Sequence, residues 1–322
     1  MREALIIGGS GQIGLGVARR LVAEGWRVRM GARTNVPGPW ETILCDRSDG
    51  IAQAVGDGAD LLLDCIAFDE THGRQLADVA GDVGHILAVS SASVYRDTQG
   101  RTLDEAATAG FPNLPVPIPE DHPTVAPGPK TYSTRKSAME LAVLDAPNAT
   151  VLRPCAIHGP DSKHAREWWF VKRLLDGRAK IPLSHEGQSR FQTTSVAAIA
   201  EAVLWAIEAK PKMVNVIDSD APTVAEIAQV IMAHMDRDAE LVPLPGPAQE
   251  CVGHTPWSTA RAFVCASAAP SVGTYAETVG PALDWLLTDV APDAWQDAIP
   301  QLAGYPRDHF DYATEDRILA SL

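Results

Sequence analysis

Residues 3–14 decide the fold of this chain, and they read Glu3-Ala4-Leu5-Ile6-Ile7-Gly8-Gly9-Ser10-Gly11-Gln12-Ile13-Gly14. The apolar run over residues 3–8 is typical of a buried strand. Gly9, Gly11 and Gly14 then match the pattern GxGxxG, and Gly8 in place of Gly9 gives the variant GxxGxxG. The helical repeat over residues 15–24 completes a strand, a glycine turn and a helix in that order.

This order is the setting in which a dinucleotide pyrophosphate binds. Glycines let the backbone approach the phosphates, and the positive end of the helix attracts them. The other interpretation is a glycine-rich turn without a ligand. We expect a cofactor here, bound by residues Gly8, Gly9, Ser10, Gly11, Gln12, Ile13 and Gly14.

The second strand, at residues 26–30, points to the type of dinucleotide. A cofactor with a free ribose 2′-hydroxyl usually meets an acidic residue at the end of this strand. Here the strand runs into Gly31-Ala32-Arg33, without an acid. A guanidinium suits a 2′-phosphate, so Arg33 predicts NADP, with NAD as the alternative. A solvated loop arginine is the competing interpretation.

Further strands at residues 43–46, 59–67, 85–90, 150–152 and 213–217 alternate with helical stretches at 75–80, 130–144 and 196–209. This alternation predicts βαβ units and a parallel sheet. Residues 111–129 hold seven prolines and are expected to form a loop. Ligands bind at the carboxyl ends of such strands, where we expect Gly8, Arg33, Asp46, Ala67 and Ser91.

Tyr132 and Lys136 stand four residues apart, so a helix would place them one turn apart on one face. A phenol has a pKa of about 10, and a nearby ammonium lowers it. The pair could therefore act as a general acid or base on an alcohol or a ketone. Alone, the spacing favours a helix with a half-buried aromatic residue and a solvated lysine, and the other motifs of the chain reverse that preference.

Composition limits the class of protein. The 322 residues exceed the size of a single core, so two lobes are expected. Hydrophobic content of 46% and charged content of 21% are typical of a globular protein. A net charge of −14 argues against general nucleic-acid binding and against attachment to an anionic membrane, so the expected partner is a small-molecule substrate.

The first residues are too short and acidic for a signal peptide, and no apolar run approaches the roughly 18 residues that span a bilayer. The five cysteines are scattered and lack CxxC spacing. They suggest neither a disulfide framework nor a zinc site, and we expect no metal. These features predict a cytoplasmic protein.

Four motifs in order resemble the extended short-chain dehydrogenase/reductases, in the NAD-dependent epimerase/dehydratase-like group. They are the glycine loop, Ser91 within residues 90–95, the Tyr132–Lys136 pair, and the segment 152–160 that reads LRPCAIHGP. The resemblance covers roughly residues 3–235. It implies an α/β fold, with a Rossmann-type doubly wound parallel sheet and a smaller mixed C-terminal substrate lobe. Residues 1–160 and 189–220 would form the dinucleotide-binding domain, and residues 161–188 and 221–322 the substrate-binding lobe.

The resemblance also implies catalytic roles. Tyr132 would donate or accept the proton and also contact the cofactor, while Lys136 would contact the nicotinamide ribose and tune Tyr132. Ser91 would hydrogen-bond the substrate oxygen, although a strand-end serine can simply cap a turn. Asp46 resembles the residue that contacts adenine, with a turn aspartate as the competing interpretation.

Substrate contacts are expected from Ser91, Ser93, His158 and Arg190. Arg190 could bind an anionic substrate or form an ion pair, and a histidine beside a Gly-Pro turn is often structural. Sugar-nucleotide dehydratases of the family carry an Asp-Glu pair just after the catalytic serine or threonine. Here Ala92 and Ser93 hold those positions, so dehydration by that route is not expected.

Three functions follow from these patterns. The first is an NADP(H)-dependent oxidoreductase that interconverts a carbonyl and a secondary alcohol. The second is a sugar-nucleotide epimerase with tightly bound NAD, and the third is a non-catalytic NAD(P)-binding regulator. Relatives often dimerise through paired helices, so a homodimer is one expected assembly.

Overall fold

The computed structural model of the chain describes all residues from Met1 to Leu322. It divides into two compact units. The first comprises Met1–Ile157, Val196–Ile217 and Cys265–Val272, and the second comprises His158–Ser195, Asp218–Val264 and Gly273–Leu322. Residues 158–160, 189–195 and 218–220, which were predicted to belong to the first domain, thus lie in the second unit, and residues 265–272, predicted for the substrate-binding lobe, lie in the first.

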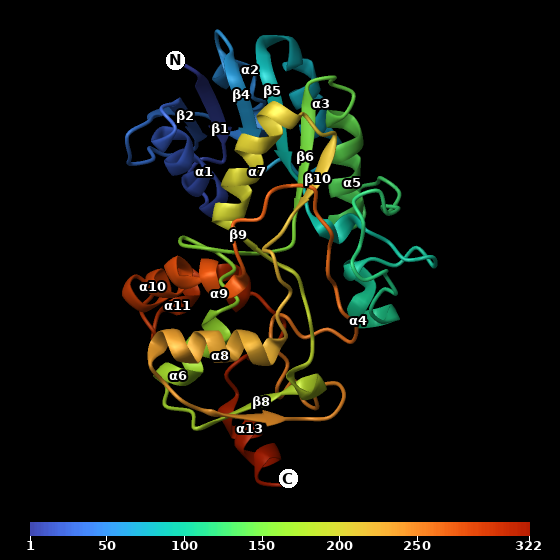
Figure 1. The fold of residues 1–322 in the computed structure, drawn as a ribbon, viewed down its shortest axis with the longest axis vertical. Coiled ribbons are helices and arrows are strands. Elements are labelled where there is room, and N and C mark those ends of the chain that lie inside the picture. The colour runs from blue at the N-terminus through green and yellow to red at the C-terminus, as the bar shows by residue number, and fades with distance from the viewer. The chain divides into compact units, whose positions relative to one another are not determined.

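A seven-stranded parallel sheet forms the centre of the first unit (Figure 1). Its strands are β1 (Glu3–Ile7), β2 (Arg27–Ala32), β3 (Glu41–Leu44), β4 (Ala59–Asp64), β5 (Val83–Val89), β6 (Ala149–Pro154) and β10 (Met213–Val216). Their order across the sheet is β3-β2-β1-β4-β5-β6-β10. The order reverses between β1 and β4, as in a doubly wound Rossmann sheet, which confirms the predicted fold class.

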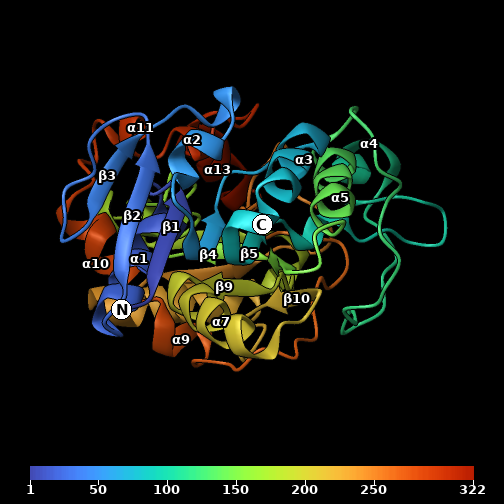
Figure 2. The same ribbon diagram turned by 90° about the horizontal axis from the view of Figure 1, so that it is seen from above.

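Helices cover both faces of this sheet (Figure 2). On one face lie α1 (Gln12–Ala23) and α7 (Val196–Ala209). On the other lie α2 (Ala52–Val55), α3 (Glu70–Asp78) and α5 (Tyr132–Val143). Because both faces are buried, the central strands are apolar at nearly every position rather than at every second one.

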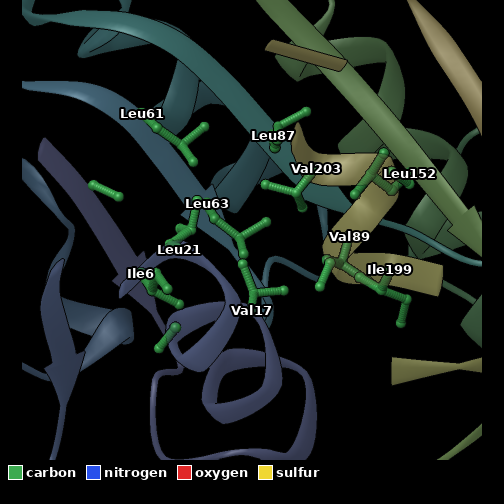
Figure 3. Close-up of a cluster of buried hydrophobic side chains, with 14 of the residues drawn as sticks. Ile6, Val17, Leu21, Leu61, Leu63, Leu87, Val89, Leu152, Ile199 and Val203 are labelled. Carbon is green, nitrogen blue, oxygen red and sulfur yellow. The ribbon is translucent and has the colours of Figure 1, made fainter. Parts of the chain in front are cut away.

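Strand β1 shows how the two cores are divided. Ala4 and Ile6 pack toward α1 and α7, whereas Leu5 and Ile7 pack toward the opposite helices. Figure 3 shows Ile6 with Val17 and Leu21 of α1 and Ile199 and Val203 of α7 in the first of these cores. Each fully buried side chain of this size contributes about 1.5–3 kcal/mol, so these cores hold the strand ends in place.

Helix α5 begins with a capping box. The hydroxyl of Thr131 accepts a hydrogen bond from the Thr134 backbone N–H, and the Thr134 hydroxyl accepts one from the Thr131 N–H at 2.9 Å. This arrangement satisfies two backbone donors that a helix start leaves unpaired. It fixes Tyr132 as the first residue of the helix.

Short elements complete the first unit: η1 (Arg47–Asp49), η2 (Ala80–Asp82), η3 (Ala92–Val94), η4 (Leu103–Glu105) and α4 (Ala106–Ala109). The proline-rich residues 111–129 contain no helix or strand, as predicted, apart from isolated bridges at Ile118 and Thr124. The chain continues from the first unit into the second through β7 (Ala156–His158).

The second unit is mainly helical. Its elements are α6 (Trp168–Leu175), β8 (Lys180–Leu183), η5 (Ser184–Gly187), β9 (Thr193–Ser195), α8 (Val224–Met235), β11 (Glu240–Pro243), α9 (Tyr275–Thr278), α10 (Gly280–Thr288), α11 (Trp295–Ala298), α12 (Pro300–Ala303) and α13 (Tyr312–Leu319). Strands β8 and β11 pair in parallel, and buried Arg173 joins α6 to Glu315 of α13 at 3.0 Å. No helix of the chain has the length and apolar character that a bilayer crossing requires.

Candidate active site

The glycine loop joins β1 to α1 where the strand order reverses. Gly8 has a φ of +77°, which favours glycine, and its N–H donates to the Gly31 carbonyl of β2 at 3.0 Å. The N-cap residue of α1 is Gly11, so no side chain caps the first turn. A helix start of this kind attracts an anion.

The loop is packed too tightly for side chains. A β-carbon on Gly14 would lie 2.7 Å from the Gly8 carbonyl oxygen and 2.8 Å from the α-carbon of Gly9. A β-carbon on Gly9 would meet the Met30 sulfur at 2.9 Å. The helix therefore starts directly against the end of the strand, which is the arrangement that a pyrophosphate site needs. In this respect the loop fits a dinucleotide.

Tyr132 and Lys136 differ sharply in their surroundings, although they share one face of α5. The Tyr132 side chain is 46% exposed, and its ring centroid lies 5.7 Å from that of Phe68. Lys136 is buried, and its ammonium donates to the Ala67 carbonyl at 2.7 Å and to the Val89 carbonyl at 2.9 Å. An ammonium has three N–H donors, so these bonds leave one for a further acceptor.

These carbonyls come from the ends of two neighbouring strands. Val89 is the last residue of β5, and Ala67 lies in the loop after β4. The competing interpretation, a solvated lysine, is thereby excluded. Burial lowers the pKa of Lys136 to about 8, opposed by the negative charges of Asp64 and Glu140. Near neutral pH most of the ammonium therefore stays charged.

The serines after β5 lie in the same unit. Ser91 is the N-cap of η3, and its hydroxyl accepts a hydrogen bond from the Ser93 N–H at 3.2 Å. The Ser93 hydroxyl oxygen is buried and has no hydrogen-bond partner. A buried hydroxyl without a partner costs free energy, and a bound polar group could satisfy it.

Arg33 and Asp46 follow the ends of β2 and β3, two neighbouring strands. Arg33 is exposed. Hydrogen bonds from the Ser48 hydroxyl and N–H at 2.5 and 2.9 Å lower the pKa of Asp46, and the charge of Arg33 adds to this effect. Asp46 thus serves as the N-cap of η1, and the Arg33 guanidinium lies near it.

The two remaining predicted residues lie in the second unit. His158 is 1% exposed, and its Nε2 lies 2.8 Å from Asp218 Oδ2, while its Nδ1 has no partner. Arg190 is exposed, and its carbonyl accepts the Phe263 N–H at 2.9 Å. Their substrate roles stay predictions.

Sequence reasoning missed three residues near Lys136. Phe68 lies between Tyr132 and Arg135, whose guanidinium is 5.4 Å from its ring centroid. Glu140 follows Lys136 by one further turn, and its carboxylate pairs with buried Arg153 at 2.6 and 2.9 Å. Asp64 ends β4. The spacing 132, 136, 140 was a readable signal for Glu140, because i, i+4 and i+8 share a helix face.

Solved structures with the same fold cover most of the chain. A dTDP-glucose 4,6-dehydratase from Bacillus anthracis, in complex with NAD, is 13% identical with a TM-score of 0.67, over 92% of this chain and 100% of that one. A UDP-N-acetylglucosamine 4-epimerase from Bacillus cereus is 16% identical with a TM-score of 0.67, over 89% and 99%. A UDP-glucose 4-epimerase from Thermotoga maritima, with UDP-glucose, is 15% identical with a TM-score of 0.65, over 88% and 98%. At such identities these likenesses establish the fold.

No curated protein matches the sequence significantly. The profile of the NAD dependent epimerase/dehydratase family matches residues 4–216, more than half of the 322 residues. This stretch contains the glycine loop, Ser91 and the Tyr132–Lys136 pair. The chain therefore belongs to the NAD dependent epimerase/dehydratase family, enzymes of the extended short-chain dehydrogenase/reductase type.

Proposed function

We propose that this protein is an NADP(H)-dependent oxidoreductase that interconverts a carbonyl and a secondary alcohol, with Tyr132 as the acid/base. The observation that carries the proposal is the placement of Lys136. Its buried ammonium sits one helical turn from a half-exposed phenol and between the ends of β4 and β5. A charged group held there favours the phenolate and so prepares Tyr132 for proton transfer.

Each of three side chains of the protein would have a separate role in the proposed reaction. The hydroxyl of Ser91 donates a hydrogen bond to the substrate oxygen, and Tyr132 gives a proton to that oxygen during reduction. Lys136 stabilises the negative charge that then develops on the phenol. The partnerless hydroxyl of Ser93 is available for a second polar contact with the substrate.

The dinucleotide supplies the hydride when it is bound. Gly8–Gly14 would hold its pyrophosphate, and the free N–H of Lys136 would reach a ribose hydroxyl. Arg33 would bind the 2′-phosphate, because no acid ends β2 to favour a free hydroxyl there. Asp46 and Ala67 would line the remainder of the site, with Asp46 toward the adenine.

A sugar-nucleotide epimerase with tightly bound NAD is the second candidate. The similar structures favour it, since several are described as UDP-sugar epimerases. The position after β2 argues for NADP instead, and Val196 is followed by Ala197 and Ala198, where the family resemblance suggests acids. In either case we propose that the second unit holds the substrate, with Arg190 as the candidate for an anionic group and His158 as a lining residue.

One experiment separates the two candidates. The purified protein is first assayed for released nucleotide after denaturation, then titrated with NADPH and NADH. A panel of ketones, aldehydes and sugar nucleotides is next screened for NADPH consumption. The oxidoreductase predicts exchangeable NADPH and net consumption with a carbonyl. Retained NAD, with interconversion of a sugar nucleotide and no net oxidation, would establish the epimerase instead.

A further inference from the structure

A buried ion pair supports the loop that follows β4. Asp64, the last residue of β4, is fully buried. Its Oδ1 accepts hydrogen bonds from the Ile66 N–H at 2.9 Å and from the Ala67 N–H at 2.8 Å. An aspartate that bonds the backbone two and three residues ahead fixes a tight turn. Asp64 thus holds the Ile66–Ala67 peptide, which adjoins the peptide that carries the Ala67 carbonyl.

Arg47 of η1 engages the other oxygen of Asp64. Its Nε donates to Asp64 Oδ2 at 2.6 Å, and its Nη2 donates to the His72 carbonyl of α3 at 3.0 Å. The guanidinium also pairs with the Gln75 side chain and is only 6% exposed. Because one carboxylate oxygen is held by Arg47 and the other by the loop after β4, the carboxylate of Asp64 has little freedom to move.

This chain of contacts ends at Lys136. The Ala67 carbonyl, one peptide after the N–H that Asp64 binds, accepts a hydrogen bond from the Lys136 ammonium at 2.7 Å. Among the charges that favour the ammonium, Asp64 has the largest effect, ahead of Glu140. The other titratable groups around the ammonium are His72 of α3 and Tyr132, one turn before it on α5. Asp64 thus both binds the residue whose carbonyl holds Lys136 and leads in stabilising the charge of Lys136.

We infer that Asp64, braced by Arg47, is a positioning residue that fixes the Lys136 ammonium and keeps it protonated. The consequence for catalysis rests on the proposed function, whereas the effect on Lys136 does not. Neither residue is expected to touch the substrate, because both side chains are buried in the first unit.

The test is the variant Asp64→Asn, with the titration of Lys136 as its readout. Protein labelled with 13C at lysine Cε is followed by NMR against pH, and the resonance that is missing in Lys136→Met identifies Lys136. An opposite charge nearby shifts a pKa by about 1–3 units. We expect Asp64→Asn to lower the titration midpoint of Lys136 by about one pH unit or more.

A matched control separates this effect from general destabilisation. Asp97 is also buried in the first unit and pairs with Arg101 at 2.8 Å, but it is not among the charges that act on Lys136. Asp97→Asn should leave the midpoint unchanged. The double variant Asp64→Asn/Arg47→Gln removes the unpaired guanidinium, so it should fold better than Asp64→Asn while the Lys136 midpoint stays low.

The inference is overturned if Asp64→Asn and the double variant move the Lys136 midpoint no further than Asp97→Asn does. Once a substrate is known, the alkaline limb of kcat/KM should move with the NMR midpoint. If the midpoint falls as expected but no carbonyl compound is reduced by any variant or by the wild type, the role of Asp64 stands and the proposed function fails.

Discussion

The ammonium of Lys136 lies 2.7 Å from the carbonyl oxygen of Ala67, and this bond joins α5 to the loop after β4. A second bond, to Val89 at the end of β5, holds the same ammonium. A lysine side chain that could otherwise adopt many rotamers is thereby fixed at the carboxyl edge of the sheet. The proposed chemistry depends on this placement.

Replacing Lys136 should therefore abolish most activity. In Lys136→Met the aliphatic volume stays but the charge that tunes Tyr132 is lost, so kcat/KM should fall by about 10²–10⁴-fold. Lys130→Met is the control, because Lys130 is exposed just ahead of the helix. The steady-state kcat/KM of both variants is compared with that of the wild type, and circular dichroism checks that both variants are folded. Equal activity of Lys136→Met and the wild type would refute the role of Lys136.

The low pKa of Lys136 also predicts a pH dependence of stability. Burial lowers this pKa to about 8, whereas an unfolded chain would have a value of about 10.4. Between these values the unfolded state binds more protons, so the free energy of unfolding should rise with pH. Urea denaturation of the wild type at pH 7 to 10 should show this increment, of about 3 kcal/mol in total. The increment should be absent from Lys136→Met, and its persistence there would assign it to other groups.

The glycine loop predicts a steric effect. In Gly14→Ala the new methyl group would lie 2.7 Å from the Gly8 carbonyl, so α1 must shift away from the strand. We expect a loss of about 1–3 kcal/mol in stability and at least tenfold weaker NADPH binding. Gly81→Ala is the matched control, since nothing lies within 4 Å of its β-carbon position. Thermal melts and fluorescence titration measure both effects, and unimpaired binding by Gly14→Ala would place the dinucleotide elsewhere.

Arg33 should distinguish the two dinucleotides. A hydrogen bond to a charged group contributes about 1.5–3 kcal/mol, so Arg33→Ala should weaken NADPH binding by about 10–100-fold and leave NADH binding unchanged. Arg74→Ala serves as the control, because Arg74 is an exposed arginine of α3 that pairs with Glu70. Isothermal titration with each dinucleotide gives both affinities. An unchanged NADPH affinity, or tighter binding of NADH by the wild type, would overturn the NADP assignment.

Glu140 and Arg153 form a buried ion pair that should contribute to the stability of the first unit. Both side chains are buried, and Arg153 also donates to the Tyr95 hydroxyl at 3.2 Å. Glu140→Gln would leave the guanidinium without a counter-charge, and we expect a loss of about 3–5 kcal/mol in urea denaturation. Glu24→Gln, at an exposed pair with Arg20, should change stability little. A similar small effect at Glu140 would mean that Arg153 finds another partner.

Much of the first unit could be predicted from its sequence. The helix over residues 196–209 and the parallel sheet were confirmed, because long apolar repeats determine buried elements. Helix α3 begins at Glu70 rather than Gln75. The Asp69 side chain accepts a hydrogen bond from the His72 N–H, so Asp69 is the N-cap of α3. An aspartate at this position is a helix-start signal that the prediction did not use.

The second unit was harder to predict. Beyond residue 243 its helices span four to nine residues, too few for a clear repeat. One start was readable, since Thr274 and Glu277 form a capping box. The bonds that fix Lys136 could not be predicted, because Ala67 and Val89 lie 69 and 47 residues away in the chain. Asp64 was not recognised as a candidate site residue, because residues 59–67 were predicted to form a single apolar strand.

The most direct test of the central claim compares the wild type with Tyr132→Phe. Reduction of the best carbonyl substrate is followed by NADPH consumption, and NADPH affinity is measured in parallel by fluorescence. The account predicts that Tyr132→Phe binds NADPH with wild-type affinity but loses about 10²-fold or more in kcat, because only the proton donor is missing. Reduction by Tyr132→Phe at the wild-type rate would contradict it.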